Sequence, residues 1–227
     1  MAIFQRLLLV AVLAGLCTGL LTSLAQHSLT VPLILQAEVF EVPSTHDHHG
    51  HDHEHTASWQ PDDGWARNLF TAFSDVMTAI GFALLLSAIW IWRGAPRALP
   101  HALAWGLAGW LSFVLAPGLG LPAELPGAVT APLGARQVWW LGSAFATAGG
   151  LALLVFARGW LWRIAAIALL LSPHVIGAPQ VVAQNSALPV GLHSEFIRAV
   201  LAVGLLFWLT LAVSTAYFFG REGPHGQ

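Results

Sequence analysis

Residues 4–25 read FQRLLLVAVLAGLCTGLLTSLA, and this stretch decides the fold class. A transmembrane helix needs about 20 mainly apolar residues, so a run whose only charged side chain is Arg6 predicts a membrane span. Five further stretches have the same character, and they occupy 68–92, 101–120, 137–157, 164–182 and 196–219. We therefore expect an all-α integral membrane protein, built as a bundle of about six transmembrane helices in a single domain, 1–227.

The overall composition supports this class. Only 9% of the 227 residues are charged, whereas soluble domains carry about 25%. The net charge of -2, with no basic cluster, argues against nucleic acid as a partner. Cys17 is the only cysteine, which excludes an intramolecular disulfide and a thiolate metal cage. The chain has no G-x-x-x-x-G-K-[ST] motif, which excludes ATP hydrolysis by P-loop chemistry.

The placement of arginine predicts the orientation. With the N-terminus inside, six arginines fall in inner segments (Arg6, Arg93, Arg97, Arg158, Arg163 and Arg221) and three in outer ones (Arg67, Arg136 and Arg198). The positive-inside rule then favours both termini in the cytoplasm and 26–67 outside, in the bacterial inner (cell) membrane. The apolar segment 29–40 is too short to span, and we expect an interfacial or re-entrant piece that continues the first helix outward. Alternatively, the first segment is a signal peptide cleaved after Ala25, which leaves five spans.

Histidine dominates one segment of the predicted outer loop 43–67. Residues 46–55 read HDHHGHDHEH, and their candidate ligands are His46, His48, His49, His51, His53, His55, Asp47, Asp52 and Glu54. Imidazole and carboxylate together suit Co, Ni, Zn and Cu(II). The fixed charges of 43–67 also sum to -4 with histidine neutral, which attracts divalent cations. We expect a flexible loop that collects metal without selecting one, the alternative being a solvated low-complexity linker.

Polar side chains within the apolar segments are costly and mark candidate functional positions. A spacing of 3, 4 and 3 places four of them on one helical face: Asn68, Thr71, Asp75 and Thr78. They line a cation path, or they provide hydrogen bonds between helices. Gly15 and Gly19 form a G-x-x-x-G motif in the first segment, which predicts close packing against a neighbouring helix.

The end of the fifth segment, 172–180, reads SPHVIGAPQ. Because proline removes a backbone donor, we expect the helix to break there, and broken helices at membrane depth line cavities. His174 is accordingly the strongest candidate for an internal metal ligand, with Gln180 beside the same break. The alternative is a kinked helix end that holds an interfacial histidine.

Further acidic residues lie near the predicted span ends. Glu124, between Pro122 and Pro126, faces the mouth of a cavity or pairs with Arg136. Glu38 and Glu41 follow the first span, where they hand metal inward from the loop or are ordinary interfacial acids.

Five short motifs together carry a family resemblance. They are VPLILQAEVFE at 31–41, WQPDDGWARNLFTAF at 59–73, LAPGLGLPAELPG at 115–127, ARQVWWL at 135–141 and LSPHVIGAPQ at 171–180. Their order resembles the CbtA family of predicted cobalt transporter subunits over nearly the whole chain. The resemblance implies cobalt uptake for cobalamin biosynthesis and a small single-span partner, CbtB. By match to the family motifs, the resemblance also implies functional roles for the loop histidines and for Glu124, Arg136, Gln137, His174 and Gln180. Family members are often described with five spans.

The function expected from these observations is uptake of a divalent metal ion, with cobalt ahead of nickel and zinc. The path would run from the loop through Glu38, Glu41 and Glu124 to a cavity near His174 and Asp75. The metal is a substrate, and we expect neither an enzyme nor a permanently bound cofactor. The first alternative is a membrane-anchored metal buffer or sensor that does not transport. A membrane metalloenzyme or haem protein is a third reading.

Overall fold

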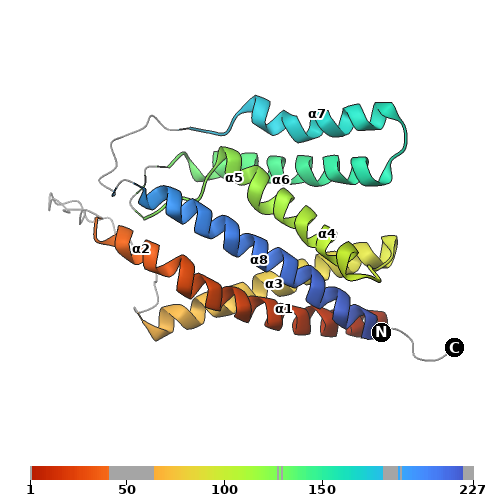
Figure 1. Cartoon of the computed structure of the whole chain (residues 1–227), viewed down its shortest axis with the longest axis horizontal. Coiled ribbons are helices and arrows are strands. Elements are labelled where there is room, and N and C mark those ends of the chain that lie inside the picture. Colours follow the sequence, from red (N-terminus) through yellow and green to blue (C-terminus); the bar gives the residue numbers. More distant parts are fainter. Residues whose placement is uncertain are drawn as a thin grey trace, which may run out of the picture.

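The structure is a computed structural model that describes residues 2–40, 64–126, 128, 130–180, 189 and 191–221. All the regular secondary structure in this part of the chain is helical. Its elements are α1 (Ala2–Leu29), α2 (Val31–Glu38), α3 (Trp65–Arg93), α4 (Leu99–Trp110), the π-helical turn η1 (Leu111–Leu115), α5 (Ala116–Gly120), α6 (Leu133–Phe156), α7 (Trp160–Ile176) and α8 (Leu192–Arg221). The long helices run along a common direction (Figure 1), as expected of a membrane bundle.

Five helical stretches are long and apolar enough to cross a membrane: α1, α3, the continuous run α4–η1–α5, α6 and α8. They correspond to five of the six predicted segments. The remaining segment, predicted at 164–182, differs from the expectation. Its helix α7 has 17 residues and ends at Ile176, so it is about 25 Å long against a hydrocarbon core of about 30 Å.

Helix α1 packs against both α3 and α8, and α8 in turn packs against α4. Gly15 and Gly19 let α1 approach the α3 backbone, since a Cβ at Gly19 would lie 2.5 Å from Val76 Cα. The predicted close packing at the G-x-x-x-G motif is therefore confirmed. On the side facing α8, the Thr18 and Ser214 hydroxyls lie 3.2 Å apart. Helix α1 also contributes Ala11 and Ala14 to the buried core cluster that it shares with α3 and α8.

Aromatic side chains join the α4–α5 run to the core. The Phe113 ring stacks on Trp208 of α8 with centroids 5.3 Å apart, and Phe82 of α3 meets Trp208 edge-on at 4.8 Å. Pro117 lies two residues after the end of the π-helical turn. A proline ring collides with the carbonyl four residues earlier in an α-helix, and a wider π turn relieves this collision. The run can thus continue to Gly120 without a break.

Helices α6 and α7 form a hairpin at the edge of the bundle (Figure 1). Helix α7 ends at Ile176, within the stretch 172–180 where the break was expected, although it passes through Pro173 first. Pro173 has no N–H for the Leu169 carbonyl, and the Ser172 hydroxyl donates to that oxygen instead, at 3.0 Å. The helix ends where Gly177 takes a φ of 82°, which strongly favours glycine.

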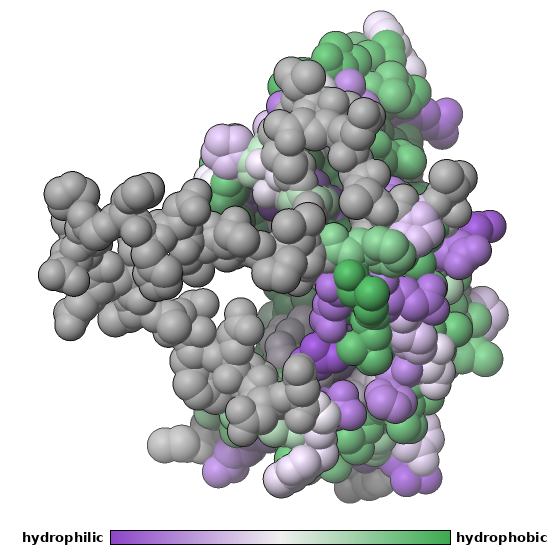
Figure 2. Space-filling view, turned by 90° about the vertical axis from the view of Figure 1, so that its left-hand side faces the viewer, coloured by the Kyte–Doolittle hydropathy of each residue, from purple (hydrophilic) through white to green (hydrophobic). Residues whose placement is uncertain are grey.

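The connections place the helix termini at two ends of the bundle. At the first, which we call the loop end, α2 stops and α3 starts. At the opposite end lie the start of α1 and the end of α8 (Figure 1). The short helix α2 continues α1 beyond Thr30, as predicted for segment 29–40. Figure 2 views the loop end, where hydrophilic side chains gather among apolar ones on the surface that the grey atoms leave visible.

Candidate functional site

A polar cleft of 520 Å³ opens at the loop end between two parts of the chain. One wall is the end of α1 with α2, and the other is the first two turns of α3. Its lining includes six polar or charged side chains besides Glu38 and Arg67: Ser23, Gln26, His27, Thr30, Asn68 and Thr71. The sequence brings them together because polar residues recur every three or four positions along α1 and α3.

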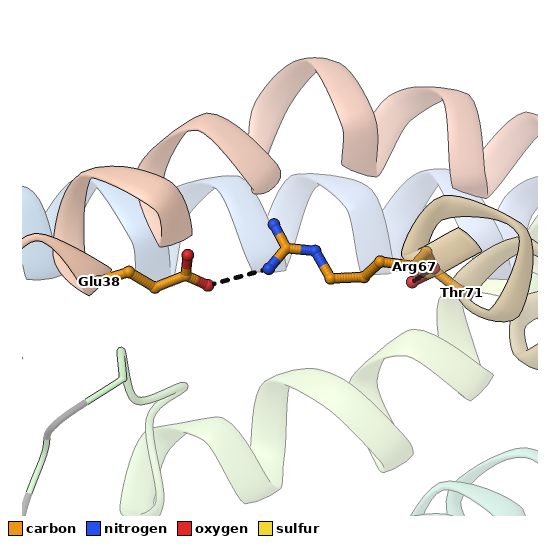
Figure 3. Close-up of polar contacts among 3 residues, drawn as sticks. All are labelled: Glu38, Arg67 and Thr71. Carbon is orange, nitrogen blue, oxygen red and sulfur yellow. Dashed lines mark hydrogen bonds and ion pairs between the residues drawn. The ribbon is translucent and has the colours of Figure 1, made fainter. Parts of the chain in front are cut away.

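One ion pair joins the two walls of the polar cleft. Arg67 Nη1 lies 3.2 Å from Glu38 Oε1, and both side chains are about one-third exposed, at 32% and 35% (Figure 3). The Thr71 hydroxyl donates to the Arg67 backbone carbonyl at 2.9 Å, so Thr71 bonds its own helix. Exposed pairs of this kind contribute about 0–1 kcal/mol, so the pair can open at little cost. Glu38, predicted to pass metal inward, is engaged by a cation in this structure.

Asp75 lies further along the same face of α3, beyond the cleft lining. Gln26 Nε2 of α1 donates to Asp75 Oδ1 at 3.1 Å. The other oxygen, Oδ2, is buried and has no hydrogen-bond partner within the described residues. A half-satisfied carboxylate inside a membrane helix is costly, so Asp75 is a candidate functional residue. The predicted polar face therefore leads from Asn68 and Thr71 in the cleft to Asp75, whereas Thr78 is exposed.

Sequence reasoning assigned no role to Gln26, which is the partner of Asp75. A signal was present, however. Thr18, Thr22 and Gln26 follow each other at intervals of four, which places them on one face of α1. Thr18 and Thr22 are buried, so this polar face points into the bundle. His27, also left without a role, lines the polar cleft.

A second polar group lies where α5, α6 and α7 meet the loop end. The alternative left open for Glu124 is resolved, because its Oε2 lies 3.0 Å from Arg136 Nη2. Gln180 donates from Nε2 to the Gly120 carbonyl at 3.3 Å. These two contacts connect the segments that follow α5 and α7 to their neighbours. Gln137, next to Arg136 in α6, is exposed.

His174 is exposed on α7, and its ring is 6.3 Å from that of Trp139, measured between centroids. It is not enclosed between helices of this chain, which differs from the expected internal position. Among the described residues, no three His, Cys, Asp or Glu side chains are close enough to hold a metal ion, so a shared site for His174 and Asp75 is not seen there. Glu41 and the loop residues 46–55 lie outside the part of the chain that the structure describes.

Comparison with known proteins identifies the family. No curated protein and no solved structure matches the chain. The family model described as "Probable cobalt transporter subunit (CbtA)" matches residues 4–220. This match begins two residues after the start of α1 and ends one residue before the end of α8, so it includes the polar cleft, Asp75 and the α6–α7 hairpin. The chain is a multi-pass membrane protein and belongs to the CbtA family of probable cobalt transporter subunits.

Proposed function

We propose that this chain carries Co²⁺ inward across a bacterial inner membrane, and that the polar cleft is the entrance to the ion path. The observation that carries the proposal is Oδ2 of Asp75 directly beneath the cleft lining, which is buried and has no hydrogen-bond partner among the described residues. A carboxylate oxygen with free lone pairs attracts a cation strongly where little water competes.

The charges of the cleft favour Asp75 as the destination of the ion. Glu38 and Arg67 in the lining cancel each other formally, and the next fixed charge along α3 is Asp75. The groups on the way are the His27 imidazole and the Gln26 amide. Imidazole, amide and carboxylate are ligand types that suit Co²⁺, although their number here favours brief contact over tight binding. Brief contact is what conduction requires, since an ion held tightly cannot leave.

In this proposal the histidine-rich segment 46–55 is the collector, and Glu41 with Glu38 passes the ion to the cleft. The excess of arginine in the predicted inner segments supports a cytoplasmic position for both termini. Nickel and zinc would bind the same histidine-rich segment, so we assign cobalt selectivity to the path from the polar cleft to Asp75. A negative potential inside the cell favours entry by about 2.3 kcal/mol per charge per 100 mV, or roughly twice that for a dication.

The second polar group has a different role in this proposal. The Glu124–Arg136 pair and the bond from Gln180 to Gly120 fix the loop ends of α5, α6 and α7. His174 on the exposed face of α7 is then presented to a partner, for which we propose the single-span CbtB-like subunit. Because α7 packs along α6, which is long enough to span, we place α7 within the membrane as a short sixth span.

The test is cobalt accumulation in cells that express Asp75→Asn. We expect it to fall by at least about tenfold, because the amide keeps the shape but removes the charge. Glu195→Gln is the matched control, since Glu195 is an exposed acid of α8 at the same end, outside the cleft lining. Unchanged accumulation in Asp75→Asn, at equal amounts of protein in the membrane, would refute the proposed path.

A further inference from the structure

A second and larger cleft, of 1050 Å³, lies at the end of the bundle opposite the polar cleft. We call it the arginine cleft. It lies between the start of α1, the end of α3 with the following loop, the start of α4 and the end of α8. Four basic side chains are part of its lining: Arg6, Arg93, Arg97 and His101. The proposed cobalt path makes no use of them, and a cluster of cations is a poor route for a dication.

The positive charge of this cleft is not balanced by carboxylates of the described residues. Along the helices that form it, the nearest acid on α3 is Asp75, 18 positions before Arg93, or about 27 Å away along the helix. On α8 the acid is Glu195, 24 positions before Phe219 of the cleft lining, or about 36 Å along the helix. The described parts of α1 and α4 have no acid at all. Within the described residues the cleft therefore has no carboxylate counter-charge, and a bound anion would supply one; Glu222, which follows α8, lies outside this part of the chain.

Two of the arginines are held in place before any ligand arrives. Arg6 Nη2 donates to the Phe219 carbonyl at 2.8 Å, and its guanidinium lies 4.8 Å from the Phe219 ring centroid. Arg6 Nε is buried and has no hydrogen-bond partner among the described residues, which leaves a donor unsatisfied. Arg93 lies 3.9 Å from the centroid of the Phe156 ring. Guanidinium groups fixed in this way match the planar, multidentate contacts that phosphate oxygens accept.

The surroundings of the cleft favour a phosphate that carries lipid chains. The cleft lies where spans α1, α3 and α8 reach one membrane surface. Large apolar side chains beside it are open to the surroundings, with Phe4 68% and Trp92 80% exposed. A lipid bound here would place its phosphate among the arginines and its acyl chains along these helices. Basic pockets between membrane helices take anionic head groups in this manner.

We propose that the arginine cleft binds the phosphate group of an anionic phospholipid of the surrounding leaflet. This inference does not depend on the proposed cobalt path. It accounts for the positive charge of the described lining, the fixed guanidinium group of Arg6 and the position of the cleft at one end of the spans. A soluble phosphate compound has the same head-group chemistry, and the experiment separates the two sources.

The experiment measures lipid binding to the purified full-length protein in a neutral detergent, by native mass spectrometry with phosphatidylglycerol or phosphatidylcholine. We expect phosphatidylglycerol to bind more tightly. Each arginine at an anionic lipid surface strengthens binding about fivefold. The double variant Arg93→Gln/Arg97→Gln should therefore weaken phosphatidylglycerol binding by about thirtyfold, and Arg97→Gln alone by about fivefold. Arg97 lies in the loop after α3, outside the helices, so the single variant keeps the test valid if the double variant does not fold.

The matched control is Arg158→Gln/Arg163→Gln, which removes two arginines at the same end of the bundle, outside the cleft lining. Its phosphatidylglycerol binding should equal that of the wild type. Equal binding of the two lipids, or an equal loss in the control, would overturn the proposal. So would displacement of bound phosphatidylglycerol by millimolar glycerol phosphate, because that result identifies the ligand as a soluble phosphate.

Discussion

Substitution of Gly19 by alanine tests how the bundle holds its candidate site. A Cβ at this position would lie 2.5 Å from Val76 Cα and 2.6 Å from Val76 N, and both atoms belong to the α3 backbone. Side-chain rotation cannot relieve a collision with backbone. Ordinary van der Waals contact begins at 3.4 Å, so α1 and α3 must separate locally by about 0.9 Å. Overpacking of this kind costs about 1–3 kcal/mol.

The separation of the two helices also affects the candidate site, because Gln26 lies two turns after Gly19 on α1. A local separation of α1 from α3 lengthens the 3.1 Å bond between Gln26 and Asp75. We therefore expect Gly19→Ala to lower both the unfolding temperature in detergent and cobalt accumulation in cells. Gly81→Ala on α3 is the matched control, since nothing lies within 4 Å of a Cβ there. Alanine favours the helix over glycine, so the control is neutral or more stable by up to about 1 kcal/mol.

The assay is thermal unfolding of the two purified variants beside the wild type, followed by circular dichroism in one detergent. Gly19→Ala should unfold at a lower temperature than the wild type, and Gly81→Ala at the same or a higher one. If Gly19→Ala is as stable as Gly81→Ala, then α1 and α3 are not in backbone contact at this point. That result would refute the packing on which the position of Asp75 depends.

Three further predictions concern single features. Glu38→Gln removes one negative charge from the polar cleft lining, and it should raise the external cobalt concentration for half-maximal uptake by about fivefold. The control Glu195→Gln should leave that concentration unchanged. Equal half-maximal concentrations in the two variants would contradict a role for the cleft. Ser172→Ala leaves the Leu169 carbonyl without the donor that replaces Pro173 N–H and should destabilise the protein by about 1 kcal/mol in thermal unfolding. Ser194→Ala is its control, because the Gly191 carbonyl still accepts from Glu195 N, and an equal loss in both variants would disprove this explanation. Deletion of 44–57 should abolish cobalt uptake at nanomolar metal and preserve it at micromolar metal, and a loss at both would show that the loop does more than collect.

Much of the fold follows from the sequence because the membrane imposes a strong and simple requirement. Long apolar runs must be helical so that their backbone groups are satisfied, and five of the predicted segments are matched by helices of sufficient length. The close contact at Gly15 and Gly19 can also be predicted from the sequence, since small residues four apart in a membrane helix usually allow close packing against a neighbouring helix. The sequence also places the end of α7 within 172–180, but it does not show which residue ends the helix. The end point depends on Ser172, whose hydroxyl compensates for Pro173, and on Gly177, which ends the helix four residues later.

The candidate site is less predictable because it depends on which helices are neighbours. Periodicity places Asp75 on a polar face of α3, but only the packing of α1 shows that Gln26 is its partner. The same holds for Glu124, whose two readings differ in whether Arg136 at the start of α6 reaches it. His174 shows the limit of local reasoning. A histidine beside a proline resembles an internal ligand in sequence, yet α7 lies at the edge of the bundle and leaves it exposed.

The most direct test of the central claim is the metal content of cells that express this chain, with and without a CbtB-like partner. Cobalt, nickel and zinc are supplied together at nanomolar concentration, and each is measured by mass spectrometry. A cobalt transporter subunit predicts selective accumulation of cobalt that the Asp75→Asn variant loses. Equal, low retention of all three metals, abolished by deletion of 44–57 and unaffected by Asp75→Asn, would contradict it and identify a protein that only holds metal at the membrane surface.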